Sequence, residues 1–402
     1  MKTMWQTRTL GELCSFIRDG NWIESKDQSP SGIRLVQTGN IGNGQFLNKA
    51  ERSHFVSEQT FSDLRCEEIF PGDVLISRLP EPIGRSCVVP DLQQRMITAV
   101  DCTIARFDKK QCSKKYFVYF SQSLQYLTTI RQYCTGTTRS RISRKNLEKI
   151  RIPIPLLSEQ ERIVGILDAV FEKIDTIQRN AERNLANAKE LFQQVLDEEL
   201  TPKNDWKKAL LKDISLGITD GDHLPPPKKP SGVPFITISN ITDQQTIDFT
   251  STFFVSLDYY NNLTSIRKAR DGDILYTVTG SYGIPVLIKG NKQFCFQRHI
   301  AIIRPNPELI NPLFLSFLLE SKNIKRQADI TATGVAQKTV SLTSLRQFNI
   351  CFPSLLLQKS IANKIELIKT DLFKIMEKYK KTIAYCSDLK QQFLTQAFNG
   401  EL

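Results

Sequence analysis

The densest basic segment of the chain carries side chains suited to contact with a polyanion. Between positions 137 and 151 the basic residues are Arg139, Arg141, Arg144, Lys145, Lys149 and Arg151, and the one acidic residue is Glu148. Lysine and arginine neutralise phosphates, and the planar guanidinium of arginine also matches the O6 and N7 acceptors of guanine. The segment, with Thr137 beside it, is therefore a candidate DNA-binding loop; the alternative is a solvated basic face.

Several other polar loops suit the same chemistry. Amides and hydroxyls can donate to phosphates, asparagine or glutamine can pair with adenine, and glycine permits close backbone approach. The candidates are Gln37, Asn40, Arg78, Arg85, Lys228, Lys229, Asn240, Ser281, Tyr282, Gln337 and Lys338. Ordinary turn chemistry is the alternative for each loop. The proline-rich run around Lys228 is either a stiff basic arm or a linker.

Motifs for catalysis are missing from the sequence. Neither a Walker-type phosphate loop nor a dinucleotide-binding glycine pattern occurs. The run Asn311-Pro312-Leu313-Phe314 lacks the second proline of the amino-methyltransferase motif and is interpreted as a helix start. The three histidines, His54, His223 and His299, are scattered and are interpreted as ordinary residues. We expect a chain that is no enzyme and holds no metal or cofactor, although a nuclease carboxylate cluster stays an open alternative.

Composition favours two folded domains with an anionic partner. The 402 residues exceed a usual single core, and 40% hydrophobic with 24% charged residues is ordinary for a folded protein. A net charge of +12 favours nucleic acid over the alternatives, basic enzymes and ribosome-associated proteins. Nine irregularly spaced cysteines without a Cys-x-x-Cys pair indicate reduced thiols. With no long apolar run, a cytoplasmic, soluble protein is expected.

The two halves of the chain match when the sequence is displaced by about 200 residues. Ordered matches include Trp5 with Trp206, Asp19-Gly20 with Asp220-Gly221, Asn40-Ile41 with Asn240-Ile241, Gly72-Asp73 with Gly272-Asp273, Thr135-Gly136 with Thr333-Gly334, and Pro155 with Pro353. An ordered series of this length indicates an internal repeat. Because the basic loop and its counterpart at 333–338 differ in charge, the repeats are expected to recognise different half-sites.

Each repeat reads as a strand-rich α+β domain. Short β-branched or aromatic runs between turns predict strands at 33–38, 74–77, 97–107 and 150–154, and at 235–239, 274–278, 300–304 and 348–352. Apolar residues at helical spacing predict one helix per repeat, at 116–130 and 312–325.

A heptad pattern follows each globular part. In the first half its apolar positions are Ile163, Leu167, Val170, Ile174, Ile177, Ala181, Leu185, Ala188, Phe192 and Val195. In the second half the seam positions are Ile361, Ile365, Ile368, Leu372, Ile375, Tyr379, Thr382, Cys386, Leu389, Phe393 and Gln396. Alternating steps of four and three, with one extra step of four at Leu185 in the first half, predict long helices that pair through these seams. We expect an antiparallel pair within one chain; packing of each helix on its own domain, or dimerisation with another chain, is the alternative.

This organisation resembles the specificity subunit of type I restriction-modification systems over essentially the whole chain. Residues 155–164, Pro-Leu-Leu-Ser-Glu-Gln-Glu-Arg-Ile-Val, and the closing Ala-Phe-Asn-Gly-Glu-Leu at 397–402 are the segments most similar to that family. The resemblance implies target-recognition domains at 1–155 and 201–353, separated by two long helices, the conserved helical regions 156–200 and 354–402. These two pseudo-symmetric domains and an antiparallel coiled coil are the expected fold.

The resemblance also implies partners and their cofactors. Methyltransferase (modification) subunits would hold the helices and restriction (motor and endonuclease) subunits would join them on double-stranded DNA, with S-adenosylmethionine, ATP and Mg used by those partners. The candidate contacts to partners are Gln160, Arg162, Gln358, Phe398 and Glu401. The two helices differ where residues 158–161, Ser-Glu-Gln-Glu, become Leu-Leu-Gln-Lys at 356–359, so equivalence of their partner sites is open.

Two other functions fit parts of the sequence. The recognition fragment of a single-chain restriction-modification enzyme would share these domains but should continue into methyltransferase or nuclease sequence. A coiled-coil scaffold without DNA binding would explain the helices and the repeat but not the basic loop.

The helices predict a dependence of target spacing on helix length. Four residues inserted into one long helix add about 6 Å and rotate the segment beyond the insertion by roughly 40°. We expect a complex with this variant to methylate targets with a longer spacer and unchanged half-site bases. Mapping of methylated positions checks this. If the half-site bases change while the spacer stays constant, the helices do not set the spacing.

Overall fold

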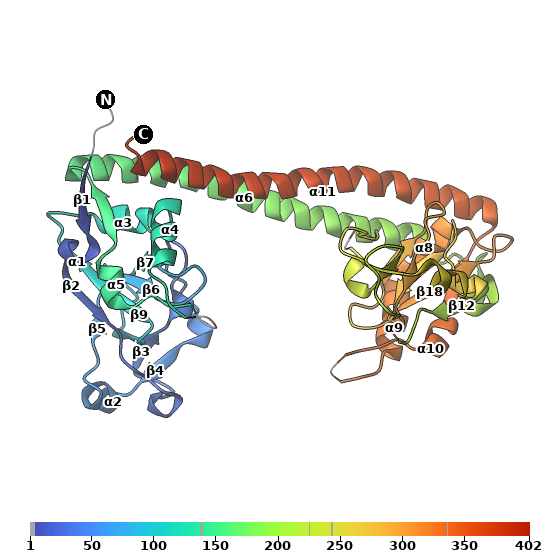
Figure 1. Cartoon of the computed structure of the whole chain (residues 1–402), viewed down its shortest axis with the longest axis horizontal. Coiled ribbons are helices and arrows are strands. Elements are labelled where there is room, and N and C mark those ends of the chain that lie inside the picture. The colour runs from blue at the N-terminus through green and yellow to red at the C-terminus, as the bar shows by residue number, and fades with distance from the viewer. Residues whose placement is uncertain (1–4, 137–139, 225, 243, 336) are drawn as a thin grey trace. The chain divides into compact units, whose positions relative to one another are not determined.

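The computed structural model describes residues 5–136, 140–224, 226–242, 244–335 and 337–402. Its contacts divide the chain into two compact units. The first unit consists of Met1–Glu182 with Lys380–Leu402, and the second of Arg183–Tyr379. Each unit thus combines one globular part with segments of both long helices, α6 (Leu157–Leu200) and α11 (Leu355–Phe398). Figure 1 labels the main elements of each unit.

The first unit is built on two four-stranded sheets and one strand pair. One antiparallel sheet has the order β2 (Cys14–Asp19), β9 (Cys102–Phe107), β6 (Val74–Ser77), β7 (Ser86–Val88). The other has the order β4 (His54–Val56), β3 (Ile33–Val36), β8 (Met96–Thr98), β5 (Glu68–Ile69), and its β3 and β8 are parallel. The pair is β1 (Gln6–Thr9) with β10 (Arg151–Ile154). Its helices are α1 (Leu10–Leu13), α2 (Glu58–Asp63), α3 (Lys114–Phe120), α4 (Leu124–Gln132) and α5 (Arg144–Glu148), with short 3₁₀ turns at Ser25–Asp27, Thr38–Asn40 and Ala50–Arg52.

The second unit repeats most of this order of elements. Its four-stranded sheet is β12 (Ser215–Asp220), β18 (Ile300–Pro305), β15 (Ile274–Thr277), β16 (Pro285–Leu287). A three-stranded sheet is β14 (Phe253–Val255), β13 (Val233–Ile236), β17 (Cys295–Phe296), and β11 (Lys207–Leu210) pairs with β19 (Asn349–Phe352). Its helices are α7 (Leu257–Asn261), α8 (Pro312–Glu320), α9 (Lys322–Thr331) and α10 (Leu342–Arg346), with 3₁₀ turns at Leu211–Ile214, Ile238–Asn240 and Ser265–Arg267. The repeat and the strand-rich α+β class predicted from sequence are confirmed.

The prediction of one helix per globular part is wrong, because a serine restarts the helix in both units. Ser123 accepts a hydrogen bond from the backbone of Tyr126 and caps α4, while α3 has already ended at Phe120. Ser321 in the same way closes α8 and caps α9 by accepting from Ile324. A serine hydroxyl at this position satisfies an N–H that the helix itself leaves unpaired. The apolar spacing continued across the break and hid it.

The strand expected at 97–107 is also two strands. A turn after β8 ends with the Cys102 N–H donating to the Ala99 carbonyl at 2.9 Å, and β9 then starts at Cys102 in the other sheet. Asp101 lies in this turn, outside either ladder. Because of this break, Asp101 lies at the end of the sheet. In a continuous strand it would lie within a ladder instead.

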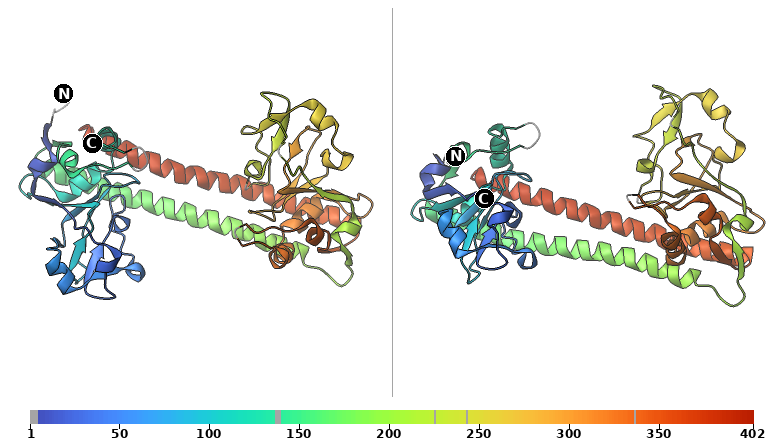
Figure 2. Two further views of the ribbon diagram at one scale, coloured as in Figure 1. Left: turned by 60° about the horizontal axis from the view of Figure 1, so that its bottom comes forward. Right: turned by 90° about the horizontal axis from the view of Figure 1, so that it is seen from below.

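The long helices pair in antiparallel fashion. In the first unit the start of α6 lies beside the end of α11 (Figure 2), and Asp175 and Lys390 form an ion pair between them. In the second unit the end of α6 lies beside the start of α11, where the rings of Phe192 and Phe373 are 6.3 Å apart. These contacts confirm pairing within one chain.

The predicted seam holds in part. Most of its apolar positions are buried or half-buried, but Ile177, Ile375 and Leu389 are at least 40% exposed. Met376 packs against the core in place of its neighbour Ile375, and Leu394 is buried. An α-helix has 3.6 residues per turn, so a straight helix drifts from a strict heptad and buries the following residue instead.

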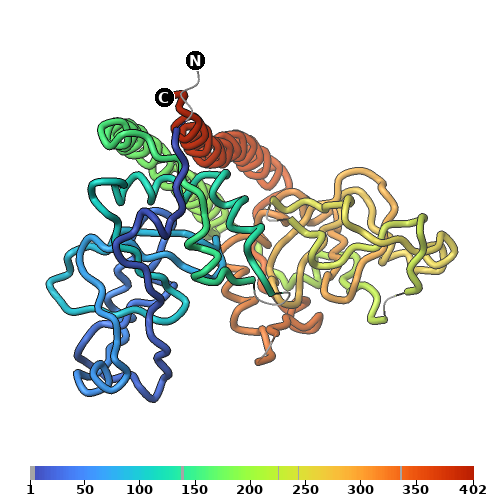
Figure 3. The backbone as a smooth tube through the Cα atoms, turned by 60° about the vertical axis from the view of Figure 1, so that its left-hand side comes forward, coloured from blue at the N-terminus to red at the C-terminus, as the bar shows by residue number. Residues whose placement is uncertain are grey.

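The helices also complete the cores of the globular parts. In the first unit Leu167, Leu394 and Phe398 belong to one buried cluster with Tyr116 and Phe117. The end of α11 lies close to Trp5 and β1: a Cβ on Gly400 would lie 3.3 Å from the Trp5 ring, and Figure 3 shows α11 ending beside β1. The long helices therefore contribute side chains to the core of each unit and also connect successive parts of the chain.

All nine cysteines lie in the described residues and none is in a disulfide. Within the same residues, no cluster of three histidine, cysteine or carboxylate side chains could hold a metal ion. No described helix combines the length and the apolar character needed to cross a bilayer.

Candidate nucleic-acid interface

Strand ends and loops converge at one end of the main sheet in the first unit. The Arg78 N–H donates to the Asp101 carbonyl at 2.9 Å, and the Ile142 N–H donates to the Arg78 carbonyl at 3.3 Å. Thr135 and Arg141, at the start of the basic segment, exchange two backbone hydrogen bonds of 3.0 Å. These bonds bring together residues from distant parts of the chain. We call Asp19, Arg78, Asp101, Arg141 and Arg144 the first cluster.

The second unit has the same set of backbone hydrogen bonds, which we call the frame. The Val278 N–H donates to the His299 carbonyl at 2.9 Å, the Val340 N–H donates to the Val278 carbonyl at 2.8 Å, and Thr333 and Thr339 exchange two backbone hydrogen bonds. We call Asp220, His223, Thr279, His299 and Thr339 the second cluster, and these residues line a hollow of about 320 Å³.

A glycine lets each frame close. A Cβ on Gly20 would lie 2.2 Å from the Thr98 carbonyl oxygen, and a Cβ on Gly221 would lie 1.9 Å from that of Phe296. No side chain fits so close to a backbone oxygen, so the repeated Asp-Gly pair is explained by packing at this end of the sheet.

The first cluster is held by ion pairs. Asp19 lies 3.5 Å from the Nε atom of Arg78 and 3.6 Å from that of Arg144, while Asp101 lies 3.1 Å from a terminal nitrogen of Arg141. The Arg78 side chain is only 5% exposed, and burial lowers the pKa of its guanidinium. Arg141 is 44% exposed. Of these three arginines Arg141 therefore has the most side-chain surface open to a ligand.

Histidines occupy the second cluster. His223 lies 2.9 Å from an Asp220 carboxylate oxygen, and Arg267 approaches the other oxygen of that carboxylate at 3.5 Å. Burial, and then the charge of Arg298, lowers the pKa of His299, so its imidazole is neutral at pH 7. A neutral imidazole offers one donor and one acceptor to a base edge, whereas the first cluster offers charged guanidinium groups.

Sequence reasoning missed both histidines of this cluster. They stand far apart in the chain and meet only because a strand end and a turn converge. One signal could have found His223: the 201-residue displacement places it opposite Trp22, whose side chain is 68% exposed. Two exposed rings at matched positions next to the repeated Asp-Gly pair would have predicted a shared surface in both units.

The structure corrects four of the arginine and asparagine predictions. Arg85 is buried, and its guanidinium donates to the carbonyls of Ile41, Leu79, Pro82 and Thr38 at 2.6 to 3.1 Å. Asn40 accepts from the Gln37 N–H at 3.0 Å and donates to a backbone carbonyl, and buried Asn240 accepts from the Thr237 N–H at 2.9 Å. These side chains hold turns together. Arg78 is likewise engaged inside the protein, donating to the Val100 carbonyl.

The remaining candidate DNA contacts stay predictions with surface positions. Lys145, Lys228, Lys229, Ser281, Gln337 and Lys338 are exposed or half-buried, and Gln37 is half-buried. The Tyr282 hydroxyl donates to Asp329 at 2.8 Å, and Lys325 lies 3.8 Å from the centre of its ring. Thr137 and Arg139 lie outside the described residues.

Most of the candidate partner contacts are engaged within the chain. Gln160 and Gln358 are fully buried, and each joins the start of a long helix to its own domain. Phe398 is buried against Tyr116 and Phe120. These three cannot contact a partner in this fold, which corrects the prediction. Two others lie at the surface: Arg162 pairs with Glu159 at 2.7 Å, donates to the Leu402 carbonyl at 2.6 Å and is 46% exposed, and Glu401 is exposed.

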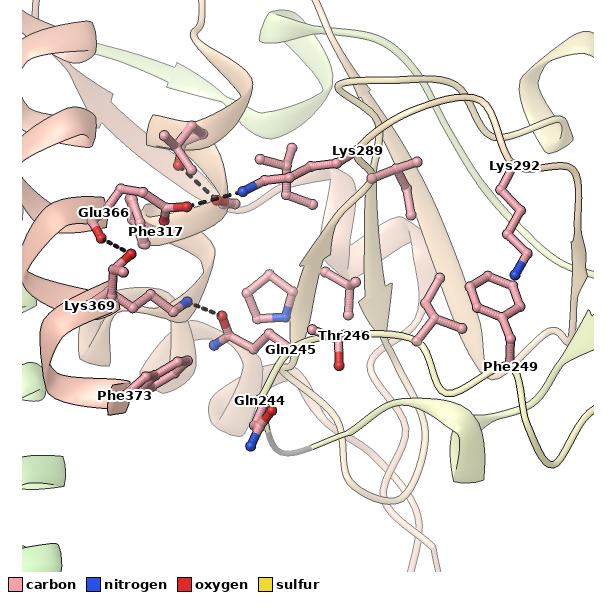
Figure 4. A pocket seen from close by; sticks show the side chains of 18 of the residues that line it. Gln244, Gln245, Thr246, Phe249, Lys289, Lys292, Phe317, Glu366, Lys369 and Phe373 are labelled. Atoms are coloured by element: carbon pink, nitrogen blue, oxygen red, sulfur yellow. Dashed lines mark hydrogen bonds and ion pairs between the residues drawn. The ribbon is translucent and has the colours of Figure 1, made fainter. Parts of the chain in front are cut away.

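A second hollow, of about 430 Å³, lies in the second unit between β16, α8 and α11 (Figure 4). Its walls are mainly apolar, and Lys369 reaches into it to meet Gln245 and, at 3.4 Å, the carboxylate of Glu320. Burial raises the pKa of Glu320. Lys369 also lies 5.2 Å from the ring centre of Phe317. This buried pair is explained as packing of the helix on its domain.

A known protein family matches both halves of the chain. A family model described as the type I restriction modification DNA specificity domain matches residues 2–185 and again residues 203–385. The two matches cover both repeats.

Individual relatives extend over most of the chain. It is 23% identical to the type I restriction enzyme EcoBI specificity subunit of Escherichia coli, over 79% of this chain and 70% of that protein. It is 24% identical to the EcoKI specificity subunit of Escherichia coli strain K12, over 92% of this chain and 82% of that protein.

Solved structures show the same fold. A chain from a structure described as the basis of complex assembly and conformational transition of the type I R-M system superposes with a TM-score of 0.76 at 19% identity, covering 99% of this chain and 98% of that chain. The HsdS subunit of Thermoanaerobacter tengcongensis gives a TM-score of 0.54 at 20% identity, covering 99% and 97%.

Proposed function

The chain belongs to the type I restriction modification DNA specificity family, and we propose that each of its two units reads one half of a bipartite DNA target with a fixed spacer. As a specificity subunit of a type I system it recognises the DNA target. The difference between the two clusters carries the finer proposal. The same backbone hydrogen bonds present arginines in the first unit and histidines and threonines in the second, each beside an aspartate, so the two units suit different bases.

We further propose that catalysis belongs to partner subunits. Modification subunits would methylate an adenine in each half-site with S-adenosylmethionine, and restriction subunits would use ATP and Mg. The absence of catalytic motifs in the sequence supports this division of roles. The exposed residues Arg162 and Glu401, near the paired helix ends of the first unit, are the candidate contacts to a modification subunit that remain accessible.

The test is reconstitution with and without partners. The purified chain alone is expected to leave DNA neither methylated nor cut, whereas the chain with its modification subunits and S-adenosylmethionine methylates one two-part motif. Sequencing of methylated adenines after each reaction provides the measurement. Robust methylation or cleavage by the chain alone would refute the division of roles, and methylation of a continuous motif by the complex would refute bipartite reading.

A further inference from the structure

We propose that Arg141 reads a guanine in the half-site of the first unit, that Asp101 positions its guanidinium, and that the matched residues Thr339 and His299 make the second unit read a different base there. This inference rests on the proposed function and names the side chains that set specificity at one position. The backbone hydrogen bonds of the two frames establish the match, since Arg141 stands where Thr339 stands and Asp101 where His299 stands.

The geometry of Arg141 suits recognition of a base edge. Its backbone is fixed by the two 3.0 Å bonds with Thr135, and its side chain is 44% exposed. Asp101 approaches one terminal nitrogen at 3.1 Å, but the oxygen concerned accepts no aligned hydrogen bond. The carboxylate therefore restrains the guanidinium electrostatically while leaving its N–H groups open. A restrained guanidinium can donate two parallel bonds to O6 and N7 of guanine.

The neighbouring arginines are less suited to this role. Arg78 is almost fully enclosed and bound to the Val100 carbonyl and Asp19. Arg144 is held between two carboxylates, 3.6 Å from Asp19 and 2.5 Å from Glu148. Arg85 is buried among carbonyls. Among the described arginines of this region, Arg141 combines exposure with a single restraining partner.

The second unit has no arginine restrained by a carboxylate at the matched position. The Thr339 hydroxyl bonds with that of Thr279 at 3.3 Å, and His299 is a half-buried imidazole whose pKa is lowered by burial. Neither side chain has the planar fork that matches guanine. Two halves with one frame and different chemistry at this position should select different bases.

The test uses the complex of the full chain with its modification subunits and a DNA library randomised over both half-sites. Methylated molecules are sequenced for the wild type and for Arg141→Ala, Arg141→Lys, Asp101→Asn and Thr339→Ala. For Arg141→Ala and Arg141→Lys we expect preference for guanine at one position of one half-site to fall about 5- to 150-fold, with the other half-site unchanged. Asp101→Asn should weaken the same preference by a smaller factor, because it removes the restraint and keeps the fork. Thr339→Ala should alter only the other half-site.

A base analogue gives a second, independent measurement on the wild-type complex. Each guanine of the selected target is replaced in turn by 7-deazaguanine, which lacks the N7 acceptor. One replacement should weaken binding by the wild type and leave binding by Arg141→Ala unaffected. The wild-type measurement remains decisive if the alanine variant fails to fold.

Several results would overturn the proposal. An unchanged motif in both Arg141 variants, or a target without any guanine sensitive to the analogue, would remove the guanine contact. A uniform loss of affinity for all sequences in Arg141→Ala, with a lower salt dependence and normal selection by Arg141→Lys, would show a phosphate contact instead. Failure of the wild-type complex to select any two-part motif would refute the proposed function itself, which is a distinguishable outcome.

Discussion

Replacement of Asp273 by alanine is expected to lower the free energy of unfolding of the second unit by about 3–5 kcal/mol. The Asp273 carboxylate is buried and accepts from two guanidinium nitrogens of Arg304, at 2.9 and 2.7 Å, and from the Arg270 N–H at 2.9 Å. The Arg304 side chain is itself only 13% exposed. Removal of the carboxylate leaves a buried cation without its counter-charge, which destabilises more than loss of a surface ion pair.

Chemical denaturation of the full chain, with hydrogen exchange to locate the loss of protection, provides the measurement. The matched variant in the first unit is Asp73→Ala, whose partner Arg106 is more exposed, so a smaller loss confined to the first unit is expected. Glu308→Ala, at an exposed loop position, is the control and should change stability by no more than about 0.5 kcal/mol. Equal effects of Asp273→Ala and Glu308→Ala would contradict a buried, paired role for Asp273.

The repeat was the part of the fold that the sequence could predict. The motif at Gly72-Asp73 and Gly272-Asp273 falls at the start of β6 and β15, and the strand predicted at 74–77 is β6 itself. Patterns of this kind are local, because turn residues and apolar runs act within a few positions. The helices also followed from local periodicity, and their pairing followed from having two matching seams in one chain.

The second sheet of each unit could not be predicted from local patterns. In the first unit, β3 pairs in parallel with β8, which lies far along the chain, and the short β5 completes the other side. Such pairings depend on loop closure and on which faces are buried, and neither is visible in a window of a few residues. The same long-range pairing separates β8 from β9 and places Asp101 beside Arg141.

Only part of the candidate site could be predicted from the sequence. A basic segment marks the loop of Arg141, but residue type alone does not tell an exposed arginine from one that turns inward. Arg85 and Arg141 look alike in sequence, yet one ends among backbone carbonyls and the other at the surface. The second cluster left no basic run in the sequence, because apart from Asp220 its side chains are threonines and histidines drawn from separate loops. Their common position follows only from the hydrogen-bonded frame.

Gln160 and Gln358 occupy matched positions in the two repeats, and from the sequence they are predicted to contact partners. Each stands five positions after the proline that precedes its helix, at the same 198-residue displacement as the prolines. The structure explains this with matched sets of bonds. Gln160 accepts from the Ser113 N–H at 2.9 Å and donates to the carbonyls of Gln111 and Pro155 at 3.0 Å. Gln358 accepts from the Asn311 N–H at 2.7 Å and donates to the Leu309 and Pro353 carbonyls.

Replacement of Gln160 or Gln358 by methionine is therefore expected to lower the stability of its own unit by about 2–4 kcal/mol. Methionine keeps the length of the side chain but leaves one N–H and two carbonyls without partners, at a cost of roughly 1–3 kcal/mol for each buried group before relaxation. Gln160→Glu is the intermediate variant, because its carboxylate can still accept from Ser113 but cannot donate. Denaturation with hydrogen exchange should show the loss at the start of α6 for Gln160 variants and at the start of α11 for Gln358 variants.

The same variants separate an internal role of these glutamines from contact with a modification subunit. If the glutamines join each helix to its domain, assembly with the modification subunit should weaken only as far as the unit unfolds, and lower temperature should restore it. Arg162→Ala supplies the comparison, since Arg162 is on the surface and its change should leave stability nearly unaffected. A Gln160→Met chain of unchanged stability that no longer binds the modification subunit would instead show that the glutamine becomes exposed for a partner.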